Sequence, residues 1–169
     1  QEPPKGAVVL FDGSNTEQWR GGRLDEENGL LNTDGRDILT KKKFNNYRMH
    51  LEFLLPYRPD ARGQGRGNSG FYQVDHYEVQ ILDSFGVLPQ TTGDCGGLYD
   101  VSTSLVNASL PPEHWQTYDI DLTAARFNKQ GDKIRNARIT VLHNGVTIHD
   151  DVELAGKTGA GDAERPEPG

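Results

Sequence analysis

Residues 76–84, HYEVQILDS, contain the side chains best suited to chemistry in this sequence. Side chains on a β-strand alternate between two faces, so one face carries His76, Glu78, Gln80 and Leu82, and the other carries Tyr77, Val79 and Ile81. The second is an ordinary core face. The first is nearly all polar and is either plain solvated surface or the floor of a binding site, where a carboxyl can act as a general acid or base.

Glu78, Gln80 and Asp83 are spaced i, i+2, i+5. This spacing resembles the E-x-D-x-x-E pattern of laminarinase-type jelly-roll glycosidases, in which a bulge turns the last acid onto the same face. Strand residues two apart lie about 6.5–7 Å apart, and glycosidase carboxyls lie about 5–5.5 Å or about 6.5–9.5 Å apart. Gln80 replaces the middle acid and Asp83 is one carbon short of Glu, which weakens the match.

Other polar residues are candidates for the same site. Glu52 lies on the polar face of the expected strand over 47–55, where it either sits beside Glu78 and raises one pKa or contacts Arg48. Asn68 lies in GNSG (67–70), which is either turn chemistry or a place of close backbone approach to a ligand. His76 follows Asp75, and this position favours a loop residue that ends a turn.

The elements that must position these residues are strands. Short alternating segments rich in β-forming residues, bounded by Gly, Asn, Asp and Pro, predict strands over 7–11, 47–55, 69–74, 76–82 and 115–122. Residues 137–154 contain Asn144-Gly145 between two alternating runs, which predicts a type I′ hairpin. This pattern is typical of an all-β sandwich or jelly roll of antiparallel strands.

Two segments are expected to be loops. Residues 56–67 are rich in Gly and Arg; they match no phosphate-binding motif and form a solvated loop or the rim of a site. The tail from 156 onward is polar and rich in Gly and Pro, and should be poorly ordered unless something packs on it. We therefore predict one sandwich domain over 1–158, followed by a tail over 159–169.

Composition excludes several classes of protein. A net charge of −7 disfavours nucleic acid as a partner, because phosphate binding needs a basic surface. No apolar run approaches the ~20 residues of a membrane span. Cys95 is the single cysteine, so an internal disulfide is excluded. The start at Gln1 favours a secreted or periplasmic protein whose signal peptide has been removed, over an artificial start.

Seven stretches in order resemble one family, the 3-keto-disaccharide hydrolase domain family. The opening motif, LF-(D/N)-G followed by a Trp, corresponds to LFDGSNTEQWRG. The others are YRMHLEFLL (47–55), GNSGFY (67–72), YEVQILDS (77–84), CGGLYD (95–100), LPPEHWQTYDIDL (110–122) and ARITVLHNGVTIHDDVEL (137–154). Together they span roughly residues 8 to 158. Members usually continue into a further segment with a Gln-x-His-Gly motif and a closing strand, so we expect a truncation before that strand.

The resemblance implies a concanavalin A-like jelly roll whose concave sheet face forms a sugar site, in exported bacterial proteins acting on glycosides oxidised at C3. The C3 ketone acidifies the C2 proton, so a base can remove that proton and the C1 group can leave, with water adding later. Glu78 is then the candidate base, and Asp83 or His76 the candidate acid. Gln80, Asn68 and Tyr99 are candidate donors to the sugar, with Glu52 beside them, and Tyr99 or Tyr72 could stack on a ring.

The rival interpretation is a non-catalytic carbohydrate-binding, lectin-like module on the same fold. An enzyme needs titratable groups that converge on one pocket, whereas Glu78 held by Arg48, or on a flat surface, would favour the binder. The His residues show no metal-ligand spacing. No cofactor is expected, and structural Ca²⁺ remains an alternative that no pattern indicates.

Overall fold

The computed structural model describes residues 2–166. Contacts divide the chain into two compact units, Gln1–Lys43 and Phe44–Gly169. The candidate site residues all belong to the second unit. The first unit contains two short antiparallel pairs, β1 (Trp19–Arg20) with β4 (Leu39–Thr40) and β2 (Arg23–Asp25) with β3 (Leu30–Asn32).

The strand predicted over residues 7–11 is not formed. The Ala7 amide donates to the Pro4 carbonyl in a turn, and Val8 and Val9 are largely exposed. The indole nitrogen of Trp19 donates to the Leu10 carbonyl at 2.8 Å. An apolar run alone predicted this strand wrongly, because a strand also needs a partner for its backbone hydrogen bonds.

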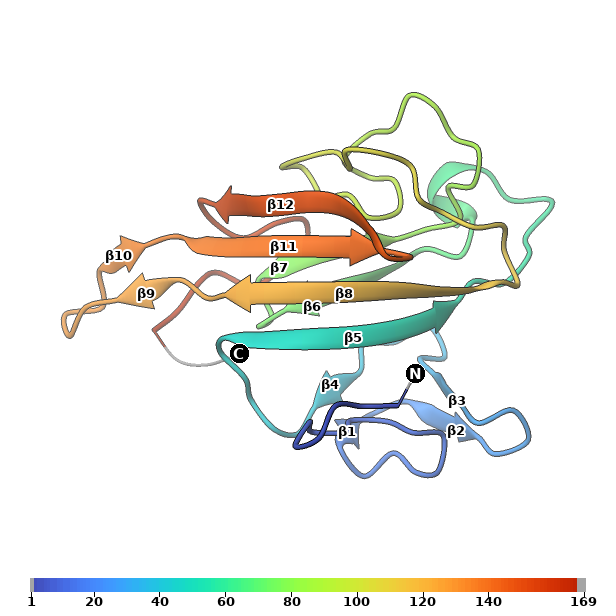
Figure 1. The fold of residues 1–169 in the computed structure, drawn as a ribbon, viewed down its shortest axis with the longest axis horizontal. Coiled ribbons are helices and arrows are strands. Elements are labelled where there is room, and N and C mark those ends of the chain that lie inside the picture. Colours follow the sequence, from blue (N-terminus) through green and yellow to red (C-terminus); the bar gives the residue numbers. More distant parts are fainter. Residues whose placement is uncertain (1, 167–169) are drawn as a thin grey trace. The chain divides into compact units, whose positions relative to one another are not determined.

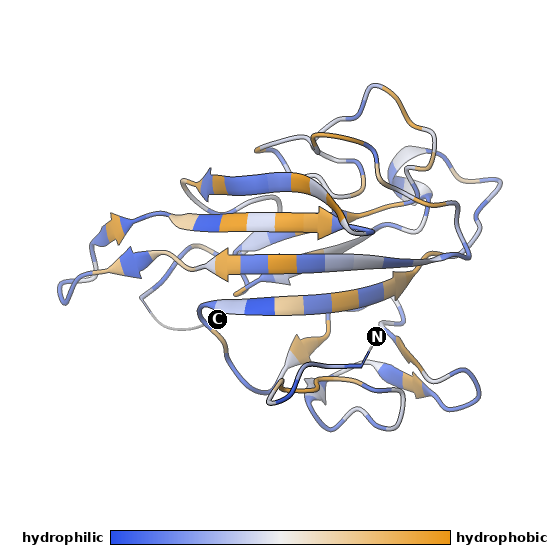
Figure 2. Cartoon of the chain, viewed as in Figure 1, coloured by the Kyte–Doolittle hydropathy of each residue, from blue (hydrophilic) through white to orange (hydrophobic). Residues whose placement is uncertain are grey.

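The main sheet of the second unit has four antiparallel strands in the order β12-β11-β8-β5 (Figure 1). These are β5 (Tyr47–Leu54), β8 (Trp115–Thr123), β11 (Ala137–His143) and β12 (Val146–Leu154). Hydrophilic and hydrophobic residues alternate along β5 and β8 (Figure 2), so each strand buries one face. Asn144 and Gly145 have φ of 50° and 79°, as the predicted type I′ turn between β11 and β12 requires.

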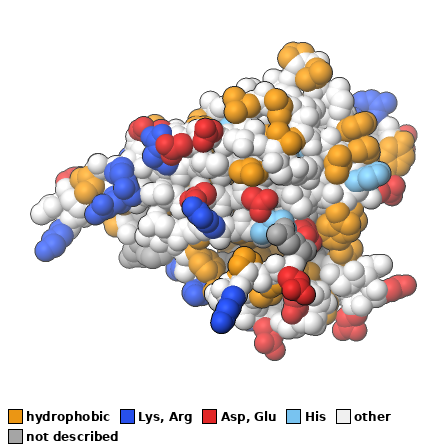
Figure 3. All heavy atoms as spheres, viewed as in Figure 1, with side chains coloured by type: hydrophobic (Ala, Val, Ile, Leu, Met, Phe, Trp, Pro, Cys, Tyr) orange, Lys and Arg blue, Asp and Glu red, His pale blue; other side chains and the backbone are white. Residues whose placement is uncertain are grey.

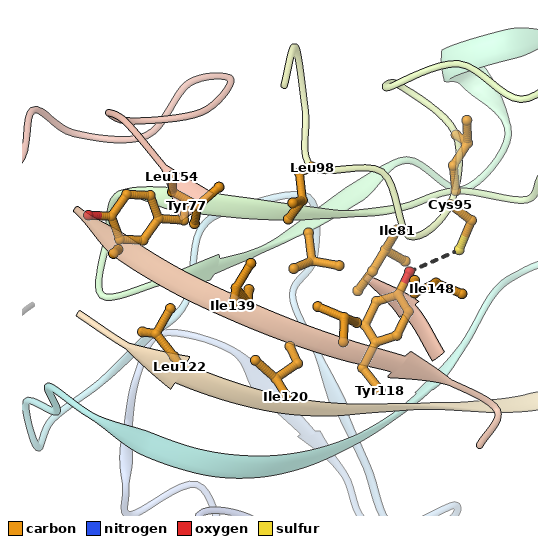
Figure 4. Packing of buried hydrophobic residues seen from close by; sticks show 14 of the residues in the cluster. Tyr77, Ile81, Cys95, Leu98, Tyr118, Ile120, Leu122, Ile139, Ile148 and Leu154 are labelled. Carbon is orange, nitrogen blue, oxygen red and sulfur yellow. Dashed lines mark hydrogen bonds between the residues drawn. The ribbon is translucent and has the colours of Figure 1, made fainter. Parts of the chain in front are cut away.

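A two-stranded layer, β6 (Ser69–Gln73) and β7 (Tyr77–Ile81), packs against this sheet. Between the two layers lies the buried core, to which β7 contributes Tyr77 and Ile81 (Figure 4). Val79 belongs to the same core. The other edge of β7 is also covered, because Gln80 exchanges backbone hydrogen bonds with Gly96 and Gly97 at 2.8 and 2.9 Å. β7 is therefore the centre of its layer.

The remaining elements of the second unit are small: β9 (Arg126–Phe127), β10 (Lys133–Arg135) and the 3₁₀ turn η1 (Gly63–Gly65). Residues 2–166 contain no α-helix, and none of their helical segments is long and apolar enough to cross a membrane. The prediction of an all-β jelly-roll sandwich is confirmed. The predicted strands over 47–55, 69–74, 76–82 and 115–122 each agree within one residue at either end.

The C-terminal segment up to residue 166 packs on the start of β7. Thr158 and Asp162 donate backbone hydrogen bonds to the carbonyls of His76 and Asp75, at 3.0 and 2.8 Å. Arg165 pairs with the carboxylate of Asp75 at 2.8 Å. The sequence analysis expected an ordered tail only if the tail packed on the rest of the chain, and this packing is present. The domain boundary at residue 158 stays a prediction.

Candidate active site

Glu78 lies at the centre of β7 with its side chain on the face opposite the core, because Tyr77 and Val79 point into the core on either side of it. Its side chain is nevertheless enclosed, and the residue is only 7% exposed. The carboxyl lies between the backbones of Gly70, on β6, and Gly159, on the C-terminal segment. A carboxyl on a solvated sheet face would be open, so this face is more than plain surface.

The surroundings of Glu78 raise the pKa of its carboxyl. Burial is the largest cause, and the negative charge of Asp100 acts in the same direction, whereas a side-chain hydrogen bond with Tyr72 lowers the pKa. Tyr72 is the direct cross-strand partner of Glu78. A carboxylate with a raised pKa is a stronger base than an ordinary glutamate, which is the property that proton abstraction requires.

Amide side chains meet at Gln80, two residues along β7 from Glu78. Gln80 is fully buried; its amide nitrogen donates to Gln64 Oε1 at 3.2 Å, and its oxygen accepts from the Ile81 amide at 2.9 Å. Gln64 in turn donates to the Gly93 carbonyl at 2.9 Å. Loops 56–67 and 91–99 are thereby tied to the floor formed by β7.

Tyr99 forms a wall beside Glu78. A Cβ atom placed on Gly159, next to the Glu78 carboxyl, would lie 3.4 Å from both Cβ and Cδ1 of Tyr99, and one placed on Gly93 would lie 3.5 Å from Cε2 of Tyr99. The structure therefore brings Tyr99 close to Glu78, on the strand that also carries Gln80. An aromatic ring beside a carboxylate and amides is a common arrangement for holding a polar ring with apolar faces.

Asp83 is held by a cation. Its buried carboxylate accepts hydrogen bonds from Arg66 Nε and Nη2 at 3.0 and 2.5 Å. Ile81 and Leu82 both belong to the core, so the strand alternation shifts after β7, and Leu82 is not on the polar face where strict alternation put it. The structure pairs Asp83 with Arg66 rather than with Glu78.

His76 lies at the contact with the C-terminal segment. Its Nδ1 lies 3.0 Å from the Asp162 carbonyl oxygen, and because a carbonyl only accepts, that nitrogen carries the proton. Its ring meets the Tyr77 ring edge-on. His76 precedes β7 by one residue, and its expected common face with Glu78 stays a prediction.

Glu52 lies on the other layer. It points to the outer face of β5, with His50 Nε2 at 3.4 Å, and His50 Nδ1 contacts Asp119 at 2.7 Å. Figure 3 shows this outer face, where acidic, basic and histidine side chains lie close together over the strands. The core separates it from the face that carries Glu78, so the expected Glu52–Glu78 pair is not formed.

Arg48 also lies on that outer face, paired with Asp121 at 2.7 Å. Arg48 therefore does not bind Glu78. An Arg48–Glu78 pair would have favoured a non-catalytic binding module, and the structure does not form it. Asn68 is exposed and directly precedes β6. Period-two alternation continued from Gly70 and Tyr72 places it on the same side as Glu78.

Sequence reasoning missed two neighbours of Glu78, Asp100 and Gly159, and it missed Gln64, which contacts Gln80. Gln64 lies in the loop that the sequence suggested as a rim, and Asp100 is the last residue of CGGLYD, directly after the predicted Tyr99. Gly159 lies in the segment predicted as a tail, and no local pattern points to it. Among residues 2–166, no group of three or more His, Cys, Asp or Glu side chains is arranged to hold a metal ion.

The fold and this face define a jelly-roll sandwich protein with an enclosed carboxyl on the face of its smaller layer. The family model of the 3-keto-alpha-glucoside-1,2-lyase-like domain matches residues 6–169, and the chain belongs to this family. The resemblance identified from the motifs is thus confirmed.

Two solved structures from Parabacteroides distasonis ATCC 8503, each described as a "putative glycosyl hydrolase", are similar. One is 32% identical, with a TM-score of 0.87, over 98% of this chain and 74% of that one. The other is 18% identical, with a TM-score of 0.57, over 84% and 70%, and shares the fold. The comparison with curated proteins gave no match.

Proposed function

We propose that this protein cleaves 3-keto-glycosides, with Glu78 as the base that removes the C2 proton. The observation that carries the proposal is the enclosed carboxyl of Glu78, whose pKa burial raises, on a face walled by Tyr99 and amide side chains. Membership of a family named for 3-keto-alpha-glucoside-1,2-lyase-like domains supports the substrate class.

The reaction proceeds by elimination. Glu78 takes the C2 proton, and the C2–H electron pair forms an enolate with the C3 ketone. As the ketone reforms, the double bond moves to C1–C2 and the C1–O bond breaks, so that the leaving oxygen departs and takes up a proton. Water then adds to the unsaturated ketone, so the overall result is hydrolysis.

The leaving oxygen needs a proton donor. Arg66 holds Asp83, whereas the Asp162 carbonyl engages only Nδ1 of His76, which leaves Nε2 as a candidate donor. We propose Tyr99 and Asp100, which follow each other beside Glu78, as further candidates for the donor. Asn68 and Gln64 are candidates for holding sugar hydroxyls, because each is exposed at the rim.

The test compares wild type, Glu78→Gln and Glu52→Gln on 3-keto-trehalose and on unoxidised trehalose, following release of 3-keto-glucose or glucose. Wild type should cleave only the keto sugar. Glu78→Gln should lower kcat by about 10²–10⁴-fold, whereas Glu52→Gln, a matched change on the other layer, should keep wild-type kcat.

Binding of the keto sugar without turnover by wild type would reject the enzyme and favour the lectin-like module. Equal activity of wild type and Glu78→Gln would reject Glu78 as the base. Export to the periplasm or the cell exterior stays a prediction.

A further inference from the structure

The carboxyl of Glu78 occupies space that side chains at two glycines would fill. A Cβ atom on Gly70 would overlap Oε1 of Glu78 and lie 2.8 Å from Cδ and 3.0 Å from Cγ. A Cβ atom on Gly159 would overlap Oε2. The three atoms closest to a Cβ at Gly70 all belong to Glu78. A larger residue at position 70 would therefore displace the Glu78 side chain.

Hydrogen bonds fix the backbone at Gly70 and next to Gly159, on the two sides of the Glu78 carboxyl. Gly70 lies within β6, opposite Gln80 in the β6–β7 register. Gly159 follows Thr158, whose hydroxyl oxygen accepts the Glu78 amide at 2.6 Å and whose own amide donates to the His76 carbonyl at 3.0 Å. One strand and the C-terminal segment therefore hold the two glycines on opposite sides of the carboxyl.

We infer that Gly70 and Gly159 are positioning residues: they form a notch free of side chains that fixes the carboxylate of Glu78 in the orientation its chemistry needs. This inference rests on the proposed function for its catalytic consequence, but the notch itself is a structural statement. It also makes the C-terminal segment a part of the site. Oε1 lies beside the backbone of Gly70 and Oε2 beside that of Gly159, and a base held in one geometry works best when the reacting proton lies along one direction.

The test replaces single glycines by alanine. Gly70→Ala is suitable because Gly70 has no positive φ, so the added methyl group meets the carboxyl without straining the backbone. Gly156→Ala is the matched control, because its methyl group would meet nothing within 4 Å and its φ is also not positive. Gly159 has φ +51°, so an alanine there would add strain and confuse the result.

Two readouts are used. Kinetics on the 3-keto-glucoside should show kcat of Gly70→Ala lowered by about 100-fold with KM little changed, and Gly156→Ala like wild type. Carboxyl ¹³C NMR titration of glutamate-labelled protein, with the Glu78 signal assigned by its loss in Glu78→Gln, should show the Glu78 pKa lowered in Gly70→Ala, because the methyl group pushes the carboxyl toward solvent. A folded Gly70→Ala protein with wild-type kcat and an unchanged Glu78 pKa would reject the positioning role of Gly70.

The titration separates this inference from the proposed function, because it needs no turnover. If wild type leaves 3-keto-glucosides intact, the proposed function is rejected. The change in the Glu78 pKa between wild type and Gly70→Ala still tests whether the two glycines position the carboxyl.

If Gly70→Ala folds poorly, a double-mutant comparison of stability tests the inference instead. In the Glu78→Ala background the overlap is gone, so adding Gly70→Ala should no longer lower the midpoint of urea unfolding. An equal drop in both backgrounds would show that Gly70 acts on something other than the Glu78 carboxyl, and would reject the inference.

Discussion

Glu78 and Asp83, five residues apart, lie in opposite electrostatic surroundings. Burial and the charge of Asp100 raise the pKa of Glu78, whereas Asp83 is buried against the Arg66 guanidinium. Divergent environments of this kind assign different roles to chemically similar acids. Glu78 is thereby suited to exchange a proton, and Asp83 to anchor loop 56–67 to the end of β7.

This anchoring role predicts a stability effect for Arg66→Leu. The substitution leaves the Asp83 carboxylate, whose side chain is 1% exposed, without its cation, so the free energy of unfolding should fall by about 3 kcal/mol. Urea denaturation at neutral pH measures it. The control is Arg48→Leu, which breaks an ion pair whose arginine is 89% exposed and should cost much less. Equal losses in the two variants would contradict a buried anchor.

At the scale of elements, alternation along β11 carries a titratable group into the core. His143 is fully buried, stacked on Phe53 and edge-on to Tyr118, with Nε2 at 2.9 Å from Gln116 Oε1. Burial lowers the pKa of His143 to about 4. Burial likewise lowers the pKa of His149 on β12. These two buried positions of the main sheet therefore favour neutral imidazoles.

The pH dependence of stability follows from these shifts. Between pH 6.5 and about pH 4, His143 is protonated in the unfolded chain but stays neutral in the folded protein, because its pKa falls from 6.5 to about 4 on folding. The free energy of unfolding should therefore be highest above pH 6.5 and fall by roughly 3 kcal/mol on acidification to pH 4, at about 1.4 kcal/mol per pKa unit, with His149 adding to the loss. Urea unfolding of wild type and His143→Leu at several pH values tests this. The variant should show a shallower slope, and an unchanged slope would exclude His143 as the cause.

At the scale of the second unit, the C-terminal segment joins separate parts of the sandwich. The Glu164 carboxylate accepts a hydrogen bond from the Tyr77 hydroxyl of β7 and one from Lys133 Nζ of β10 at 2.6 Å. Asp162 and Arg165 attach the same segment to the loop before β7. Residues far apart in sequence thus complete the surroundings of Glu78.

Glu164→Ala should destabilise the protein, because it leaves the buried Tyr77 hydroxyl and the Lys133 ammonium without this acceptor. We expect the free energy of unfolding to fall by about 2 kcal/mol and the Glu78 amide to exchange its hydrogen faster as the segment loosens. Unfolding curves and hydrogen exchange measure the two effects. Glu17→Ala, at an exposed glutamate of the first unit, is the control. Unchanged exchange at Glu78 would mean that the segment is held without Glu164.

The sequence by itself determined the strands over 47–55, 69–74, 76–82 and 115–122, the hairpin at Asn144-Gly145 and the core face of β7, and it made Glu78, Gln80 and Tyr99 candidates for the site. Each of these follows from alternation or turn chemistry within a few residues, or from ordered family motifs. It did not determine the partners of the acids. Arg66 for Asp83, the outer face of the main sheet for Glu52, and Asp162 for His76 depend on which segments the fold brings together.

The tertiary structure alone decided how Glu78 is enclosed. Gly70 is 8 residues from Glu78 and Gly159 is 81 residues away, and neither shows in the sequence that it leaves room for a carboxyl. Alternation fixes only the face on which a side chain lies. What covers that face is set by long-range packing, and this packing supplies the desolvation that raises the pKa of Glu78.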